Sequence, residues 1–304
     1  MKNLRNLSIT WEIPPSLSGK VLREFLRDEK QMSRKTLAEI KYKGGALLVN
    51  DREETVRALV KPGDKITVVF PPEQVSPLLT GKTYPFSIVA EDDHMMVVHK
   101  PAGLPTVPSK ERPGYSLAHA VIGYYECEGV PSTFHAVNRL DKDTSGLMIV
   151  AKHRYAHDLF VKAQQKGNLV REYQALVSGQ LEKKEGTIDA AIGRKESSII
   201  ERIVSPGGQP AITHYQALAE SRNASLVHVQ LETGRTHQIR VHFASINHPL
   251  LGDTLYGGNS STISRHALHS WKLTFEHPLT GKMHTYVEKL PQDMEAAWLR
   301  ESEA

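Results

Sequence analysis

The sequence predicts an α+β fold with a mixed, largely antiparallel sheet, preceded by a smaller α/β domain. Short runs rich in β-branched residues recur through the last two thirds of the chain, with only a few helical stretches between them. This order differs from the regular strand–helix alternation that builds a parallel sheet. A proline-rich segment beginning at Pro71 separates this region from a shorter one with helical periodicity.

Composition excludes several classes of protein. Of the 304 residues, 39% are hydrophobic and 24% are charged, which is ordinary for a globular protein of about two domains. The longest apolar runs are too short to span a bilayer, and residues 1–10 lack the apolar segment of a signal peptide. Cys127 is the only cysteine, so an intramolecular disulfide and a thiolate metal cluster are excluded. We expect a cytoplasmic protein that has no membrane partner.

The positive charge is concentrated near the N-terminus. Residues 1–75 carry 14 Lys and Arg against 10 Asp and Glu, and this surplus equals the net charge of +4 of the whole chain. Basic segments bind phosphates in nucleic-acid-binding proteins, but they also occur as solvated helix faces. Charge alone leaves both interpretations open.

The first domain is expected over residues 13–72, and it begins with two helices. Apolar residues at positions 21, 22, 25 and 26 recur at helical spacing and predict the first helix. Ser33 stands where an N-cap is expected for a second helix over residues 34–41, in which Leu37 and Ile40 face inward.

Two strands are expected after these helices, at residues 47–49 and 66–70, with turns at 50–51 and 62–64. This order, together with the segments SRKTLAEIKYKGGALLVN and VKPGDKIT, resembles the small RNA-binding domain named after ribosomal protein S-four. The resemblance implies that the basic second helix contacts structured RNA through Arg34, Lys35, Lys41 and Lys43. The alternative is that these four residues are only solubilising charges.

Residues 73–84 are expected to form a linker, because prolines interrupt helices and central strands. The second domain is expected over residues 85–304. Its predicted strands lie at residues 86–89, 95–99, 146–151, 172–178, 225–232 and 283–287, and its clearest helices at 153–165 and 238–245.

A charged loop precedes one of these strands, in the segment HAVNRLDKDTSGLMIVAK over residues 135–152. Loops anchored on rigid strands often carry reactive groups. Acidic and hydroxyl residues in such a loop can also do no more than cap a turn. The residue types by themselves do not decide between these alternatives.

The motif RLDKDTSGL resembles the catalytic motif of the RluA-type family of ribosomal and transfer RNA pseudouridine synthases. Three further segments match that family in the right order: VVHKPAGL (97–104), REYQALVSG (171–179) and LETGRTHQIRVH (231–242). Four ordered motifs make a more specific signal than one. The resemblance implies the mixed-sheet pseudouridine synthase fold and a cofactor-free isomerisation of uridine in RNA.

The resemblance also implies the roles of individual residues. Asp141 corresponds to the catalytic aspartate and Tyr173 to the active-site tyrosine. Arg240 corresponds to the arginine that pairs with the catalytic carboxylate. Arg139 corresponds to the arginine that enters the RNA stack where the target uridine leaves.

Supporting roles are implied for Lys100, beneath the catalytic loop, and for Arg235 and His237, near the loop that carries Arg240. Two positions depart from the family pattern. Asn138 stands where a histidine is usual, and Arg171 stands where a lysine is usual.

These residue types suit the reaction. Pseudouridine formation breaks the bond from ribose to the base nitrogen, turns the base and rejoins it through carbon 5, which requires one ionised carboxylate as nucleophile or base. An aromatic side chain can stack on the uracil, at roughly 1–3 kcal/mol per base. Extrusion of the base costs a few kcal/mol, and a planar guanidinium can fill the space it leaves.

Two other functions are weighed against an RNA pseudouridine synthase. A non-catalytic RNA binder or ribosome-assembly factor would need the basic N-terminal region but not the reactive residues together. A metal-assisted RNA hydrolase would need clustered ligands, yet His237 and His242 are five residues apart rather than four and lack the acidic partner of helical zinc motifs, so no metal is expected. Ribosomal RNA is favoured as partner, transfer RNA stays open, and a monomer is expected.

Overall fold

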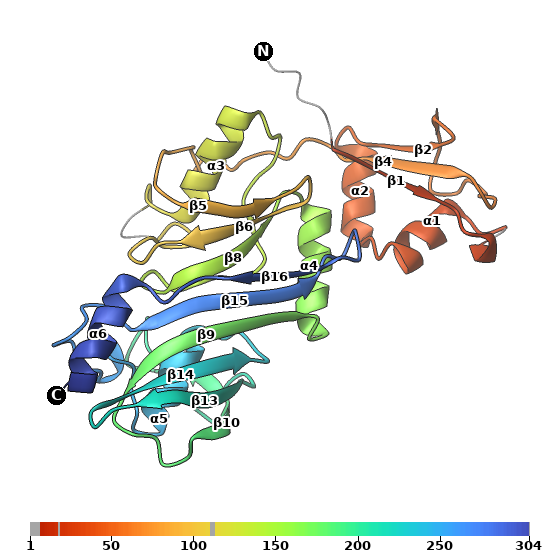
Figure 1. Ribbon diagram of the computed structural model, residues 1–304. Helices are drawn as coiled ribbons and strands as arrows, with labels where there is room; N and C mark the ends of the chain where they lie inside the picture. Colours follow the sequence, from red (N-terminus) through yellow and green to blue (C-terminus); the bar gives the residue numbers. More distant parts are fainter. Residues whose placement is uncertain (1–6, 18, 110–112, 304) are drawn as a thin grey trace.

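The computed structural model describes residues 7–17, 19–109 and 113–303, which form a four-stranded sheet, a ten-stranded sheet and a two-stranded ribbon. Figure 1 shows the small sheet beside one end of the large one. The predicted α+β class with largely antiparallel sheets is confirmed. Of residues 1–10, which are not expected to form a signal peptide, the first six lie outside the described residues.

The small sheet has the strand order β1-β4-β2-β3, and every pair is antiparallel. Its strands are β1 (Ser8–Glu12), β2 (Ala46–Val49), β3 (Arg52–Glu53) and β4 (Lys65–Val69). Strands β2 and β4 were predicted from the sequence, whereas β1, which begins before residue 13, was not. The alternation of polar and apolar residues along SITWE was the available signal in the sequence.

Helices close one side of this sheet. The short 3₁₀ helix η1 (Pro15–Leu17) precedes α1 (Leu22–Glu24), which continues into a π-helical turn, η2 (Phe25–Glu29), and α2 (Arg34–Tyr42) follows. Ser33 caps α2 as predicted, because its side chain accepts a hydrogen bond from the Thr36 N–H at 3.0 Å.

The small sheet is joined to the rest of the molecule through α4 (Arg154–Gln165). Tyr155 of α4 stacks on Phe70, with ring centroids 5.7 Å apart, and meets Trp11 edge-on at 6.3 Å. The expected linker also takes part, since a Glu73 carboxylate oxygen accepts from the Arg154 N–H at 2.8 Å. The domain limits themselves stay a prediction.

The large sheet runs in the order β10-β13-β14-β9-β15-β8-β6-β5, with β16 paired to β15 and β7 paired to β8. Only the β8–β15 pairing is parallel among the described strands; it sets Ser145 opposite His269 and Gly146 opposite Ser270. The strands are β5 (Ser87–Glu91), β6 (Met95–Lys100), β7 (His135–Ala136), β8 (Ser145–Ala151), β9 (Leu169–Ser178), β10 (Glu185–Asp189), β13 (Ile212–Glu220), β14 (Ala224–Leu231), β15 (Leu268–Glu276) and β16 (Met283–Val287). The separate ribbon pairs β11 (Ile192–Arg194) with β12 (Arg202–Val204).

Helices cover both faces of the large sheet, so its central strands are buried on both sides. One core holds α3 (Leu117–Glu128) and α5 (Gln238–Ser245) against Met148 and Val150 of β8. The alternate β8 residues Leu147 and Ile149 pack against α4 on the opposite face. The C-terminal helix α6 (Gln292–Glu303) packs against Leu176 of β9, on the opposite face of that strand from Tyr173 and Ala175.

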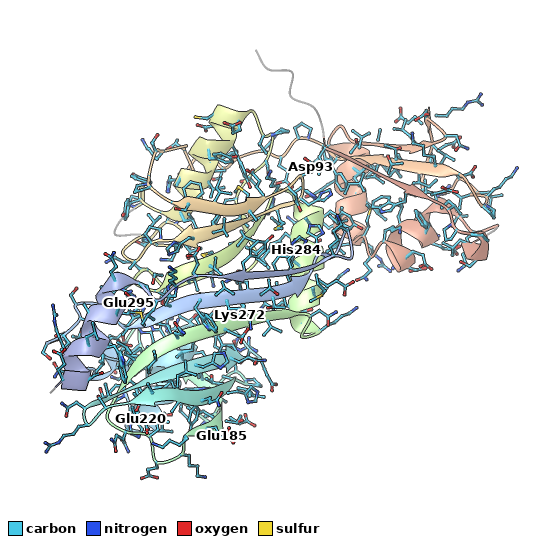
Figure 2. All side chains as sticks on the ribbon, in the orientation of Figure 1. Asp93, Glu185, Glu220, Lys272, His284 and Glu295 are labelled. Carbon is cyan, nitrogen blue, oxygen red and sulfur yellow. The ribbon has the colours of Figure 1, made fainter. Side chains whose placement is uncertain are left out.

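Charged groups lie on the face of β9 and β15 that α6 covers only in part. Lys272 of β15 lies in the middle of it (Figure 2), and its Nζ contacts a Glu172 carboxylate oxygen at 2.9 Å. Glu185 and Glu220 mark the β10 side of the sheet in the same view. No helix in the described part of the chain is long and apolar enough to cross a membrane.

Gly146, at the start of β8, provides a test of the β8–β15 contact. Its φ is +113°, and a Cβ at this position would lie 2.2 Å from the Ser270 carbonyl oxygen. We expect Gly146→Ala to lower the free energy of unfolding by about 2 kcal/mol or more, because the added methyl group would overlap the Ser270 carbonyl oxygen and alanine disfavours this φ angle. Urea unfolding followed by circular dichroism measures this.

Gly207→Ala is the matched control, because a Cβ there has no neighbour within 4 Å. Equal stabilities of the two variants would contradict the close approach of β8 and β15.

Candidate active site

One cavity of about 500 Å³ opens above the large sheet, where the loop before β8 faces β9 and the N-terminal end of α5. Six of the residues singled out in the sequence line it: Arg139, Asp141, Tyr173, Arg235, His237 and Arg240. They come from three segments that lie far apart in the chain. The fold therefore brings residues from separate sequence motifs together in one cavity.

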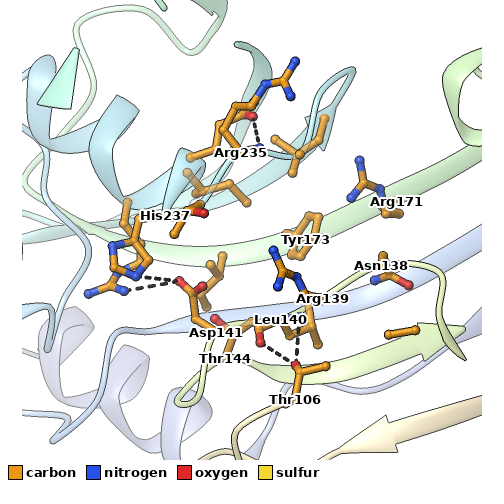
Figure 3. Close-up of a pocket in the computed structure, with 18 of the residues that line it drawn as sticks. Thr106, Asn138, Arg139, Leu140, Asp141, Thr144, Arg171, Tyr173, Arg235 and His237 are labelled. Carbon is orange, nitrogen blue, oxygen red and sulfur yellow. Dashed lines mark hydrogen bonds and ion pairs between the residues drawn. The ribbon is translucent and has the colours of Figure 1, made fainter. Parts of the chain in front are cut away.

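The loop that carries Asp141 is held by hydrogen bonds on both sides. The Thr106 hydroxyl donates to the Leu140 carbonyl at 2.6 Å and accepts from the Leu140 N–H at 3.2 Å (Figure 3). Asn138 Oδ1 accepts from the Ile149 N–H at 3.1 Å, which ties the start of the loop to β8. Reactive groups need such supporting contacts to keep their geometry.

Lys100 supports the same loop from below. Its side chain is fully buried, and its Nζ donates to the carbonyl oxygens of Pro101, Leu104 and Lys142 at 2.8–2.9 Å. Burial lowers the pKa of Lys100 from its usual 10.5 to about 7. Because Lys142 follows Asp141 directly, Lys100 fixes the backbone next to that carboxylate.

A buried ion pair orients Asp141. Arg240 Nε and Nη2 donate to both carboxylate oxygens of Asp253, at 2.6 and 2.7 Å, and its Nη1 donates to Asp141 Oδ2 at 3.2 Å. Burial disfavours the charged guanidinium, but hydrogen bonds and charges from Asp253 and Asp141 outweigh this and raise the pKa of Arg240. The guanidinium carbon also lies 5.0 Å from the Tyr256 ring centroid.

His237 approaches the same oxygen of Asp141. Its backbone is left-handed, with φ of 58°, at the position just before α5. Its Nδ1 is 2.8 Å from the Tyr256 hydroxyl, and its Nε2 is 3.8 Å from Asp141 Oδ2. Burial lowers the pKa of His237, so the imidazole is mainly neutral at pH 7.

Tyr173 forms the apolar wall of the cavity. It lies on β9, is 3% exposed, and burial raises the pKa of its hydroxyl, which stays protonated at neutral pH. Figure 3 shows Asp141 and His237 on one side of Tyr173, and Asn138 and Arg171 on the other. Arg139 is exposed on the loop at the cavity edge.

The predicted contacts of the first domain lie elsewhere. Arg34, Lys35, Lys41 and Lys43 are exposed on or next to α2, and none of them lines this cavity. Lys43 Nζ lies 3.3 Å from a Glu39 carboxylate oxygen.

Three residues that contact the site residues were not predicted from the sequence: Thr106, Asp253 and Tyr256. The residue types around Asp253 do not indicate that its carboxylate binds Arg240. The contact of Thr106 with the Leu140 carbonyl and that of Tyr256 with His237 arise only from the tertiary fold.

Two histidines of the C-terminal region contact hydroxyl groups at the start of β8. His266 Nε2 lies 2.8 Å from the Thr144 hydroxyl, and His269 Nδ1 lies 2.9 Å from the Ser145 hydroxyl. Burial lowers the pKa of His266 to about 2 and that of His269 to about 3. In the described ranges, no three His, Cys, Asp or Glu side chains are grouped so that they could hold a metal ion.

Comparison with known proteins gives one consistent result. The profile of the RNA pseudouridylate synthase family matches residues 94–245. A Bacillus subtilis protein named "Uncharacterized RNA pseudouridine synthase YjbO" is 47% identical over 266 residues, which cover 88% of this chain and 94% of that protein. The "Ribosomal large subunit pseudouridine synthase D" of Haemophilus influenzae is 34% identical over 302 residues, covering 94% and 93% of the two chains.

Solved structures share the fold. "Human RNA Pseudouridylate Synthase Domain Containing 1" superposes with a TM-score of 0.58 at 23% identity, covering 71% of this chain and 89% of that chain. "Human RNA Pseudouridylate Synthase Domain Containing 4" gives a TM-score of 0.57, also at 23% identity, covering 70% and 92%.

Lys100 yields a pH-dependent prediction. The folded protein releases the Lys100 proton near pH 7, whereas the unfolded chain holds it until about pH 10.5, so raising the pH between these values favours the folded state. We expect the free energy of unfolding of the wild type to rise relative to Lys100→Met by up to about 1.4 kcal/mol per pH unit in this window.

Denaturant titrations of both proteins between pH 7 and 10 measure this difference, with Lys100→Met as the reference that has no titratable group at the position. Parallel curves would mean that the three carbonyl acceptors keep the ammonium form of Lys100 throughout.

Proposed function

Because the chain belongs to the RNA pseudouridylate synthase family, we propose that it isomerises specific uridines of large-subunit ribosomal RNA, with Asp141 as the catalytic carboxylate and no cofactor. The resemblance seen in the four motifs is confirmed at the level of the family, and the chain is an RNA pseudouridine synthase. The observation that carries the assignment of Asp141 is its position, at the cavity edge and bonded to the buried Arg240–Asp253 pair.

The choice of large-subunit ribosomal RNA rests on a relative. The Haemophilus influenzae protein that matches 94% of this chain is named for the large ribosomal subunit. We extend that substrate class to this chain as a proposal, together with a cytoplasmic location and a monomeric state. Transfer RNA is the alternative substrate, and the labelled-RNA experiment below separates the two.

Asp141 has one oxygen available for the reaction. Arg240 and His237 both approach Oδ2, at 3.2 and 3.8 Å, which leaves Oδ1 without a protein partner within the described part of the chain. The carboxylate side chain is 27% exposed, so it can reach a substrate in the cavity. Either first step, attack on the ribose or removal of a proton, can use Oδ1.

Tyr173 and Arg139 complete the proposed reaction site. The Tyr173 ring lines the cavity and offers an apolar surface for the uracil. The target base must first leave its stack, which costs a few kcal/mol. Arg139 is exposed at the cavity edge, where its planar guanidinium can stack on the neighbouring bases and fill the space left by the uridine.

Residues outside the cavity are proposed to hold the RNA or support the loop. Arg34, Lys35, Lys41 and Lys43 present an exposed basic surface around α2, suited to phosphate contacts. Arg235 supports the loop before α5, because its Nε donates to the Pro210 carbonyl oxygen at 3.0 Å.

Tritium release from RNA labelled at carbon 5 of uridine tests the proposal, because this hydrogen is lost when the new carbon–carbon bond forms. The wild type should release tritium from large-subunit ribosomal RNA and not from transfer RNA, with or without a chelator. Asp141→Asn keeps the shape of the side chain but loses the charge, and it should reduce the rate by at least about 10³-fold.

Release by both proteins would remove Asp141 as the catalyst. Release from transfer RNA alone would change the substrate class. No release from either RNA, with binding retained, would favour a ribosome-assembly factor, and loss of release on chelation would favour metal-assisted chemistry.

Arg139→Ala tests the role in base extrusion. We expect kcat/KM to fall about 10- to 100-fold on folded ribosomal RNA, since about 1.4–2.8 kcal/mol of support for the opened stack is lost. On a short linear fragment with the same uridine the loss should be much smaller, because little stacking has to be broken. An equal loss on both substrates would show that Arg139 does not act in extrusion.

A further inference from the structure

The cavity has a second polar wall, on the side of Tyr173 away from Asp141 (Figure 3). Asn138, Gln164 and Arg171 line it. Each has a buried polar atom with no hydrogen-bond partner among the described residues: Asn138 Nδ2, Gln164 Oε1 and Arg171 Nε. Buried polar groups are nearly always paired, so three unpaired atoms in one wall indicate a ligand.

Arg171 lacks a counter-charge. It is only 4% exposed, its Nη2 reaches the Thr233 carbonyl oxygen at a long 3.4 Å, and no carboxylate in the described part of the chain lies within ion-pair distance. A buried charge without a counter-charge is costly, which points to a negatively charged group in the bound ligand. Gly234 leaves room for the Arg171 guanidinium, because a Cβ there would lie 3.0 Å from Arg171 Nη1.

Asn138 adds a second donor. It is 5% exposed, and its Oδ1 is already occupied by the Ile149 N–H at 3.1 Å. That bond fixes the orientation of the amide, since the reverse orientation would place two donors face to face. The Asn138 NH₂ group is therefore held toward the cavity as a donor.

Gln164 supplies an acceptor on the same wall. It lies in the last turn of α4, and its Oε1 is buried. An acceptor requires a donor from the ligand, for which a hydroxyl group is suitable. The wall thus offers one cation, one neutral donor and one acceptor.

We infer that Asn138, Gln164 and Arg171 form a subsite for the sugar–phosphate backbone of a nucleotide next to the target uridine. Phosphate oxygens accept from Arg171 and Asn138, and the ribose 2′-hydroxyl donates to Gln164. The inference rests on the proposed function, in that the uridine occupies the space between Tyr173 and Asp141. Arg171 is two residues from Tyr173 on β9, roughly 7 Å along the strand, so the subsite lies beside the uridine.

Such a subsite would do two things. The phosphate contact sets which nucleotide faces Asp141 without reading the base, since phosphate contacts position rather than specify. The 2′-hydroxyl contact lets the enzyme distinguish RNA from DNA at one position.

Interference mapping tests the subsite without knowledge of the target position. Transcripts of large-subunit ribosomal RNA, ethylated at random phosphates, are separated into bound and free fractions. Ethylation at one phosphate next to a uridine should prevent binding to the wild type but have no further effect on binding to Arg171→Gln. Arg171→Gln should also weaken binding about 10-fold and lower the slope of log Kd against log salt by about 1.

Asn138→Asp is the second variant, because it keeps the acceptor for the Ile149 N–H and replaces the donor by a negative charge. Asn138→Asp should bind the RNA more weakly, and ethylation of the same phosphate should no longer affect its binding. For Gln164, transcripts with random 2′-deoxynucleotides should show interference near that phosphate with the wild type but not with Gln164→Ala. Arg222→Gln, an exposed residue that does not line the cavity, is the charge control and should keep the full pattern.

The inference is overturned if folded Arg171→Gln or folded Asn138→Asp shows the wild-type interference pattern and salt slope. Should Arg171→Gln fail to fold, the interference pattern of Asn138→Asp tests the subsite in its place. Because binding is measured rather than turnover, a failure of the subsite is distinguished from a failure of the proposed reaction, which tritium release reports.

Discussion

The bidentate ion pair between Arg240 and Asp253 is the contact on which the candidate site depends. Asp253 takes Nε and Nη2 of the guanidinium, so Nη1 is the group turned to Asp141. Asp253 therefore holds the Arg240 guanidinium in place, and Arg240 in turn orients the Asp141 carboxylate. Removing one member of a buried pair strands the other charge, typically at 3–5 kcal/mol, so the site and the local fold are stabilised together.

The large sheet sets the distance across the cavity. Strand β15 lies between β8, which follows the Asp141 loop, and β9, which carries Tyr173. The parallel β8–β15 pairing occurs at the end of β8 nearest that loop. Helix α5 packs against the same face, which brings Arg240 over the loop. The strand order therefore determines the geometry of a site whose residues are far apart in sequence.

Periodicity and motifs predicted much of this structure, and the omissions have physical causes. The clear apolar runs of β6 and β8 and the amphipathic α2 were predicted close to their observed limits. Helix α3 was missed because it is buried on most sides and shows little periodicity. Strand β15 was missed because a bulge and the polar run His269-Ser270 break its alternation. The site residues came from the family resemblance, whereas the role of Asp253 arises only from tertiary contact.

Helix α4 has a consequence for substrate choice. Its first turn inserts Tyr155 into the apolar core of the small sheet, and its last turn places Gln164 at the cavity. One stiff helix of 12 residues thus separates the small domain from the reaction site. If α2 binds the RNA as proposed, the distance between the bound part of the RNA and Asp141 is fixed by the protein. The enzyme would then select a uridine by its position in the folded RNA. Two RNAs of unrelated sequence would compete for the enzyme if the distance from the segment bound at α2 to the uridine were the same in both.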